Sequence, residues 1–149
     1  YPYHAQILAM FEQIGLWPAF EQWKSLLAQE VAAIKKVNPD ARITLWDFSG
    51  FSNFQCEIIP AKGDRTSATK WYWEGGHFKP ALGDVVLSRL LGKPQESFVK
   101  GGMGFPLTLA NLDENRQRIE RERATCTAVY PQLFSDAAAL VMDSRRKHQ

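Results

Sequence analysis

Residues 42–48 read Arg-Ile-Thr-Leu-Trp-Asp-Phe, and this stretch decides the fold class that the sequence predicts. It is β-branched and aromatic and is bounded by turn residues, a combination typical of a strand. Before it, residues 18–37 place apolar side chains at helical spacing, among them Phe20, Trp23 and Ile34. Because a long helix followed by a short apolar strand is half of a βαβ unit, we predict an α/β fold with a short parallel sheet.

Working outward from this strand, the pattern predicts a helix-rich chain with one to three short strands. The 149 residues fit one domain. We expect an α/β part over 1–92 and a C-terminal helical extension over 107–146. Apolar spacing, prolines and glycines indicate further helices over 5–14, over 80–91, from 111 and from 131.

Composition excludes several function classes. The hydrophobic fraction of 45% is enough for a sizeable core, and a net charge of +2 gives no indication of a nucleic-acid surface. No apolar run approaches the ~20 residues of a membrane span. A glycine-rich phosphate loop after a strand is missing, so we expect no nucleotide cofactor.

Cys56 and Cys126 lie far apart in the sequence, without the spacing of metal ligands. The pair could form a disulfide in an oxidising compartment. Two buried thiols are the interpretation that the sequence favours, because free cysteine is often a small buried side chain.

The strongest candidate for chemistry lies in the stretch Trp-Tyr-Trp-Glu-Gly-Gly-His over residues 71–77. Two glycines let the backbone turn sharply enough for Glu74 and His77 to approach each other. A carboxylate beside a histidine fixes the ring tautomer and stabilises the imidazolium, as a general base requires. The simpler interpretation, a surface acid and a helix-capping histidine, is favoured by spacing alone. The three aromatic residues could form a sugar-stacking platform or fill the core.

Three further residues are possible supports for such a site. Asp47 ends the strand and could orient His77 or position a loop backbone through Ser49. Ser49 follows in a turn that lacks the Gly-x-Ser-x-Gly elbow of a nucleophile, and a hydroxyl that satisfies turn amides is its favoured interpretation. His4 lies near the beginning of the chain, where a hydrogen-bonded structural histidine is the favoured interpretation. A metal site joining His4, His77 and Glu74 or Asp47 is the alternative, but no spacing specifies one, and we expect none.

The block over 74–84, Glu-Gly-Gly-His-Phe-Lys-Pro-Ala-Leu-Gly-Asp, resembles the last catalytic block of SGNH/GDSL-type hydrolases. In that family an Asp-x-x-His turn precedes a C-terminal helix. The longer stretch over 43–91 looks like bacterial SGNH-like proteins, which are distantly similar to acyltransferases that modify cell-surface polysaccharides. The resemblance implies a flavodoxin-like three-layer fold. It also implies that His77 is the general base and that Glu74 takes the place of the usual aspartate.

The same resemblance implies an incomplete domain. The family's nucleophilic serine, in a Gly-Asp-Ser block, has no counterpart in these 149 residues. We therefore expect the C-terminal part of an SGNH-like esterase or acyltransferase for esters or acylated carbohydrates, inactive alone. Its partner would be the N-terminal part of the same protein or a second copy. The family implies an extracytoplasmic or membrane-anchored protein. The alternative is a non-catalytic structural or binding module that keeps the fold without the nucleophile.

Overall fold

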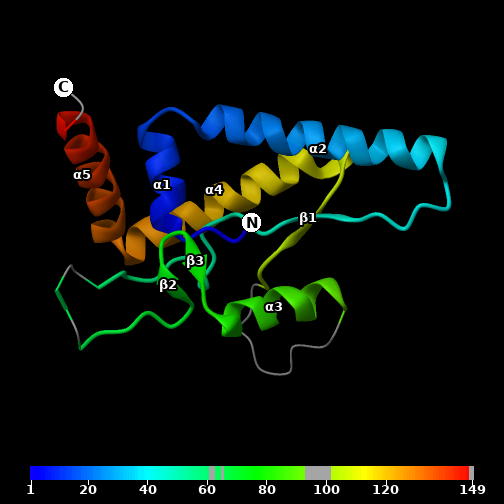
Figure 1. The fold of residues 1–149 in the computed structure, drawn as a ribbon. Helices are drawn as coiled ribbons and strands as arrows, with labels where there is room; N and C mark the ends of the chain where they lie inside the picture. Colours follow the sequence, from blue (N-terminus) through cyan, green and yellow to red (C-terminus); the bar gives the residue numbers. More distant parts are fainter. Residues whose placement is uncertain (61–62, 65, 93–101, 148–149) are drawn as a thin grey trace.

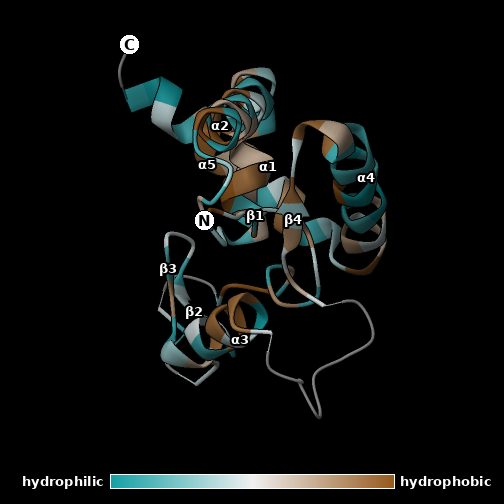
Figure 2. Ribbon diagram, turned by 90° about the vertical axis from the view of Figure 1, so that its right-hand side faces the viewer, coloured by the Kyte–Doolittle hydropathy of each residue, from teal (hydrophilic) through white to brown (hydrophobic). Residues whose placement is uncertain are grey.

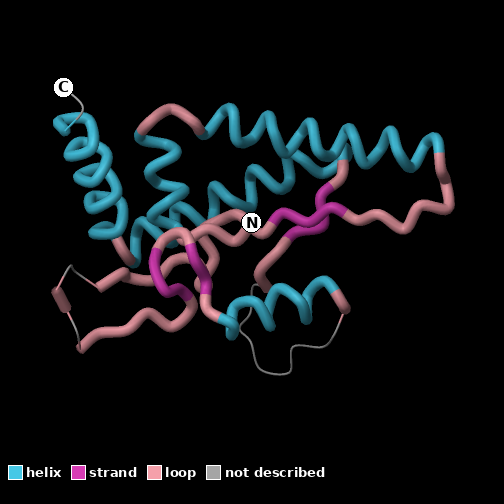
Figure 3. Tube along the Cα trace, in the orientation of Figure 1, coloured by secondary structure: helices cyan, strands magenta, loops and turns pink. Residues whose placement is uncertain are grey.

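A computed structural model describes residues 1–60, 63–64, 66–92 and 102–147 (Figure 1). The chain is helix-rich, as predicted, with strands of only two or three residues (Figure 3). The helices are α1 (Ala5–Gln13), α2 (Trp17–Val37), α3 (Pro80–Leu90), α4 (Leu112–Val129) and α5 (Pro131–Lys147), with a 3-10 turn, η1 (Leu109–Asn111). The strands are β1 (Leu45–Asp47), β2 (Tyr72–Glu74), β3 (His77–Phe78) and β4 (Phe105–Leu107).

The predicted parallel sheet is wrong, because both strand pairs among the described residues are antiparallel. β1 pairs with β4, and Leu45 lies opposite Leu107. β2 and β3 form a hairpin in which Glu74 lies opposite His77. The spacing of apolar residues indicates that a strand forms, but it does not determine the direction of its partner. The partner of β1 contains Pro106, and a proline gives little strand signal in a sequence.

The buried face of α2 agrees with the predicted stripe only in part. Phe20 is half-buried against the core, whereas Trp23 and Ile34 of the same stripe are exposed. The residues buried on α2 are Lys24 and Ala28, four positions apart and therefore on one face. An apolar pattern that surrounds most of a helix does not show which side packs, and a lysine inside the buried face obscures it further.

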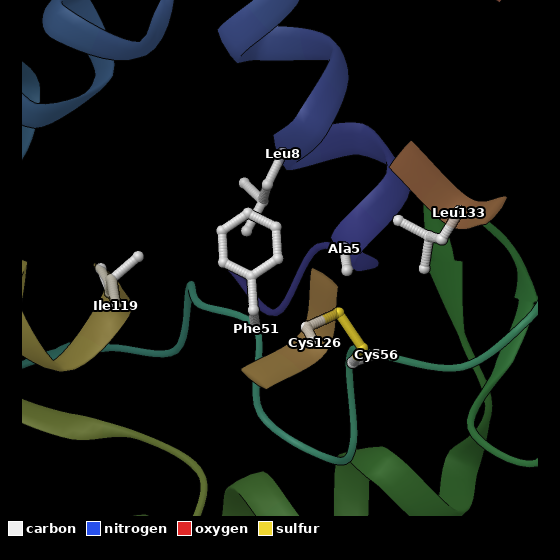
Figure 4. Packing of buried hydrophobic residues seen from close by; sticks show 7 residues of the cluster. All are labelled: Ala5, Leu8, Phe51, Cys56, Ile119, Cys126 and Leu133. Carbon is white, nitrogen blue, oxygen red and sulfur yellow. A yellow bond between two sulfur atoms is a disulfide. The ribbon is translucent and has the colours of Figure 1, made fainter. Parts of the chain in front are cut away.

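Two hydrophobic clusters hold the molecule together. In one, residues of α1, α4 and α5 pack around Phe51 (Figure 4). In the other, Phe48 and Phe54 pack against the first residues of the hairpin and against Leu82 and Val85 of α3. In Figure 2 the hairpin and α3 lie below β1 and β4, α1, α2 and α5 lie above them, and α4 lies beside β4.

Cys56 and Cys126 form a disulfide inside the first cluster, with their Cα atoms 5.9 Å apart (Figure 4). The prediction of two free thiols is therefore wrong, whereas the prediction that both residues are buried is confirmed. The bond joins the loop after β1 to α4 across 70 positions of sequence. Such a separation hides the proximity of the two residues from any local pattern.

Candidate functional site

Glu74 and His77 meet at the tip of the β2–β3 hairpin, where the sequence predicted their approach. The Glu74 Oε1 atom contacts the Nδ1 atom of His77 directly. The other carboxylate oxygen, Oε2, accepts a hydrogen bond of 2.7 Å from the backbone N–H of Gly76. The backbone N–H of Gly76 thus holds the carboxylate of Glu74 beside His77.

The pair is open to solvent. The His77 side chain is 80% exposed and the Glu74 side chain 57% exposed. Within the described part of the chain, the Nε2 atom of His77 has no hydrogen-bond partner. The Gly76 amide and the contact with His77 lower the pKa of Glu74 below its ordinary value. Glu74 is therefore a carboxylate at neutral pH, held against one ring nitrogen while the other nitrogen faces outward.

The hairpin is held from the beginning of the chain. The phenol of Tyr1 donates a hydrogen bond of 3.1 Å to the carbonyl oxygen of Gly76. The backbone N–H of His4 donates a hydrogen bond of 3.4 Å to the carbonyl oxygen of Gly75. A side chain at position 75 would come within 3.1 Å of Ile7, so the turn packs closely against α1. These contacts fix the place of the tip although its polar side chains are exposed.

His4 is a structural histidine, as the sequence favoured. Its side chain is completely buried, and its Nδ1 atom accepts a hydrogen bond of 3.1 Å from the Gln6 amide at the start of α1. Its Nε2 atom lies 2.8 Å from the carbonyl oxygen of Glu57 and, as the N–H nitrogen, donates to it. Burial lowers the pKa of His4 to about 4. Both nitrogens are committed, so the ring has no free position for a substrate or a metal.

Asp47 does not orient His77, because both of its carboxylate oxygens are committed elsewhere. Oδ1 accepts hydrogen bonds from the backbone N–H and the hydroxyl of Ser49, at 2.8 and 2.6 Å. Oδ2 accepts one of 2.7 Å from the Asn115 side chain and lies 3.0 Å from the Lys24 ammonium. Burial raises the pKa of Asp47, but Lys24 and these hydrogen bonds outweigh it, so the net shift is downward.

The buried polar junction is the set Lys24, Asp47, Ser49 and Asn115, and it joins α2, β1 and α4. Lys24 and Asn115, which are 3% and 1% exposed, are the two members that the sequence interpretation missed. The signal of Lys24 was its place four residues before Ala28, on the face of α2 that is buried. The hydroxyl of Ser49 donates a hydrogen bond to Asp47, and the hydroxyl of Ser52 contacts the Gln55 side chain. Neither serine is therefore paired with a histidine.

The aromatic stretch before the hairpin divides into two environments. Trp71 and Tyr72 are buried in the second cluster, so they do not form an open platform. Trp73, next to Glu74, is 67% exposed, with the ammonium of Lys79 4.8 Å from its ring centre. Of the three aromatic residues proposed to stack on a sugar, only Trp73 is exposed, and it lies beside the Glu74–His77 pair.

The structure describes no set of three or more histidine, cysteine or acidic residues placed to hold a metal ion within residues 1–60, 63–64, 66–92 and 102–147. Across the same ranges, none of the helices has the length and apolar character needed to cross a membrane. A pocket of about 230 Å³ lies between α2 and the β1–β4 ribbon, lined by residues such as Ala28, Trp46 and Leu107 rather than by the exposed pair. No protein-family model, curated protein or solved structure was found to match the chain.

Proposed function

We propose that Glu74 and His77 are the orienting acid and the general base of an SGNH-type serine ester hydrolase or acyltransferase. The observation that carries the proposal is the contact between the Glu74 carboxylate and Nδ1 of His77, in a side chain that is 80% exposed and whose Nε2 has no hydrogen-bond partner among the described residues. The contact fixes the tautomer with the proton on Nδ1, so that Nε2 keeps the lone pair that a base needs. In this proposal the flavodoxin-like three-layer fold belongs to the complete domain.

The proton path follows from this geometry. Nε2 of His77 takes the proton of a serine hydroxyl while the serine oxygen attacks the carbonyl carbon of an ester. The imidazolium, stabilised by Glu74, returns that proton to the departing alcohol, and an acyl-serine remains. Water then releases the acid, or an acceptor alcohol receives the acyl group, with His77 again taking the proton of the attacking hydroxyl.

The nucleophile is expected on a segment outside these 149 residues, from the N-terminal part of the same protein or from a second copy. Ser49 and Ser52 support this expectation, because their hydroxyls are buried and bonded to neighbours. The exposure of the pair agrees with it as well, since a base completed by another segment must face outward. The Cys56–Cys126 disulfide supports an extracytoplasmic location, because such bonds persist in oxidising compartments.

An ester of a carbohydrate is the substrate class that we propose. Trp73 supports it, because an exposed indole beside the pair offers an apolar face of the kind on which sugar rings stack. The same side chain would also suit other esters with a flat or apolar alcohol part.

Labelling of the full-length protein with a fluorophosphonate serine probe tests the proposal. We expect His77→Ala to lower the labelling rate by at least about 100-fold, the usual contribution of a general base. Glu74→Gln should lower it less, because the amide keeps the shape but loses the charge, and Glu74→Asp should restore part of the rate. His148→Ala is the matched histidine control and should label like the wild type. Labelling that is unchanged in His77→Ala would overturn the assignment.

A non-catalytic structural or binding module is the second candidate. It is favoured by one observation, that the serines after β1 take part in buried hydrogen bonds rather than in a catalytic pair. The full-length gene sequence separates the two functions. A Gly-Asp-Ser-like block upstream of Tyr1 supports the enzyme, and its absence supports the module.

A further inference from the structure

Glu57 lies at the base of the hairpin and makes an unusual set of contacts for a glutamate. One carboxylate oxygen accepts a hydrogen bond of 2.7 Å from the backbone N–H of Lys70. The other accepts hydrogen bonds of 3.0 and 3.1 Å from those of Trp71 and Tyr72. Three consecutive amides that converge on one anion form a strong, directional contact, because each hydrogen bond is assisted by charge.

These amides belong to the segment that leads into β2, two to four residues before Glu74. Hydrogen bonds to a single carboxylate fix the direction in which this segment enters the hairpin. The return strand is fixed to the same place, because the Lys79 amide donates a hydrogen bond of 2.8 Å to the carbonyl oxygen of Trp71. Tyr72 lies opposite Phe78 at the base and Glu74 opposite His77 at the tip, with an irregularity between the two pairs. The contacts at the base therefore hold both strand ends from which the Glu74–His77 tip extends.

Glu57 is itself held by the residue before it. Cys56 is bonded to Cys126 of α4, so the backbone beside Glu57 is covalently attached to a long helix. The carbonyl oxygen of Glu57 receives the Nε2 hydrogen bond of His4. A pocket of about 140 Å³ is lined by both cysteines.

We propose that Glu57 is a positioning residue for the Glu74–His77 pair and that the Cys56–Cys126 disulfide anchors it. The inference rests on the proposed function, since the pair has chemical meaning only if His77 is a base. Reduction by a dithiol would weaken the anchor. The dithiol supplies two electrons and two protons, the sulfur–sulfur bond becomes two thiols, and the reductant closes to its own disulfide.

Nuclear magnetic resonance gives a readout that does not depend on activity. In the wild type, the ring nitrogens of neutral His77 should show the tautomer with the proton on Nδ1. Glu57→Ala should lose this preference, and hydrogen exchange at the Lys70, Trp71 and Tyr72 amides should become at least tenfold faster. Glu57→Gln, which keeps one acceptor oxygen, should fall between the two. Amide exchange in α4 reports whether the variants remain folded.

Asp64→Asn is the matched control. Asp64 also accepts hydrogen bonds from backbone amides, those of Thr66 and Ser67, but in a turn away from the hairpin. This variant should leave the His77 tautomer and the amides at 70–72 unchanged. A Glu57→Ala protein with wild-type exchange at 70–72 and a wild-type His77 tautomer would overturn the proposal.

Two further arms separate this inference from the proposed function. Glu57→Ala should slow fluorophosphonate labelling of the full-length protein by about tenfold through its effect on His77. If labelling requires His77 but not Glu57, the positioning role fails and the proposed function stands. If labelling never requires His77 while Glu57→Ala still disturbs its tautomer, the proposed function fails instead. Dithiothreitol and the Cys56→Ser/Cys126→Ser double variant should both speed exchange at 70–72, and unchanged exchange would remove the disulfide from the proposal.

Discussion

His4 and His77 lie in adjoining segments of the chain, joined by a hydrogen bond from the His4 amide to the Gly75 carbonyl, but their rings have opposite surroundings. The ring of His4 is completely buried, and both of its nitrogens are used. The ring of His77 is mostly exposed and uses one nitrogen. The fold thus uses both ring nitrogens of His4 and only one of His77, and this difference is the reason why we propose a chemical role for His77 and not for His4.

The acids divide in the same way. Asp47 is buried, with hydrogen-bond or ionic partners on both carboxylate oxygens. Glu74 is exposed, and its carboxylate contacts the Gly76 amide and the His77 ring. A buried charge costs much free energy unless its partners compensate, so those partners are not free for another task. The side chains of the junction around Asp47 are therefore occupied with one another, whereas the hairpin pair is exposed to solvent.

The largest expected effect comes from removing the acid of the buried junction. Asp47→Ala removes one of the two carboxylates beside the buried Lys24 ammonium, leaving only Glu21 at 2.7 Å, and it removes the acceptor of Ser49 and Asn115. We expect a loss of about 4 kcal/mol in the free energy of unfolding. Asp47→Asn keeps an oxygen for Ser49 and should cost less. Urea denaturation followed by tryptophan fluorescence measures both. A loss below about 1 kcal/mol for Asp47→Ala would show that the buried junction contributes no more to stability than the exposed Glu74–His77 pair.

The second largest effect is expected from the protonation of His4 at acidic pH. Its pKa in the folded protein is about 4, below the ordinary 6.5, so the unfolded chain binds more protons between these values. Stability should therefore fall by about 3 kcal/mol as the pH drops from 6.5 to 4. Below the ordinary pKa of Asp47, 3.8, a further loss should follow, because the folded-state pKa of Asp47 is lowered. Denaturation curves at half-unit pH steps measure this dependence. In His4→Gln the slope between pH 6.5 and 4 should largely disappear, and its persistence would assign that slope to other groups.

Arg123 and Glu12 give an intermediate case. Their two hydrogen bonds of 2.6 Å join α4 to α1, and both side chains are only partly exposed. Arg123→Lys keeps the charge but loses the paired geometry, so we expect a loss of about 1 kcal/mol or less. Thermal unfolding at low and high salt measures the loss and how strongly it is screened. A cost as large as that of Asp47→Ala would mean that burial does not decide the contribution of an ion pair in this fold.

The smallest effect on stability is expected at the hairpin tip. His77→Ala removes an exposed side chain, and the free energy of unfolding should change by no more than about 0.5 kcal/mol. Calorimetry of the wild type and the variant measures the difference. A loss above about 1 kcal/mol would show that His77 contributes to the fold, and the contrast with His4 would no longer hold.

Local features of the fold could be predicted well from the sequence. Residues 18–37 and 80–91 are recognised as helices because apolar spacing, an initial proline and a final turn residue act within a few positions. The approach of Glu74 to His77 is also local, since two glycines and a three-residue separation are enough to indicate it. Both predictions depend only on the chain's immediate neighbourhood.

Contacts between distant segments could not be predicted. The antiparallel partner of β1 is a strand 58 or more positions later that contains a proline, and no local pattern announces it. Lys24 looks like a solvated residue until Asp47 is placed beside it. Glu57 gives no signal at all, because its partners are backbone amides, which every sequence has.

The bond between Cys56 and Cys126 also determines what a protease can do to this chain. The two cysteines close a covalent ring that contains the hairpin and α3. A single cut anywhere inside that ring leaves both pieces attached to each other. Nicked protein should therefore migrate as one band without reductant and as two with it, and the hairpin that carries His77 should stay tethered to both halves after cleavage.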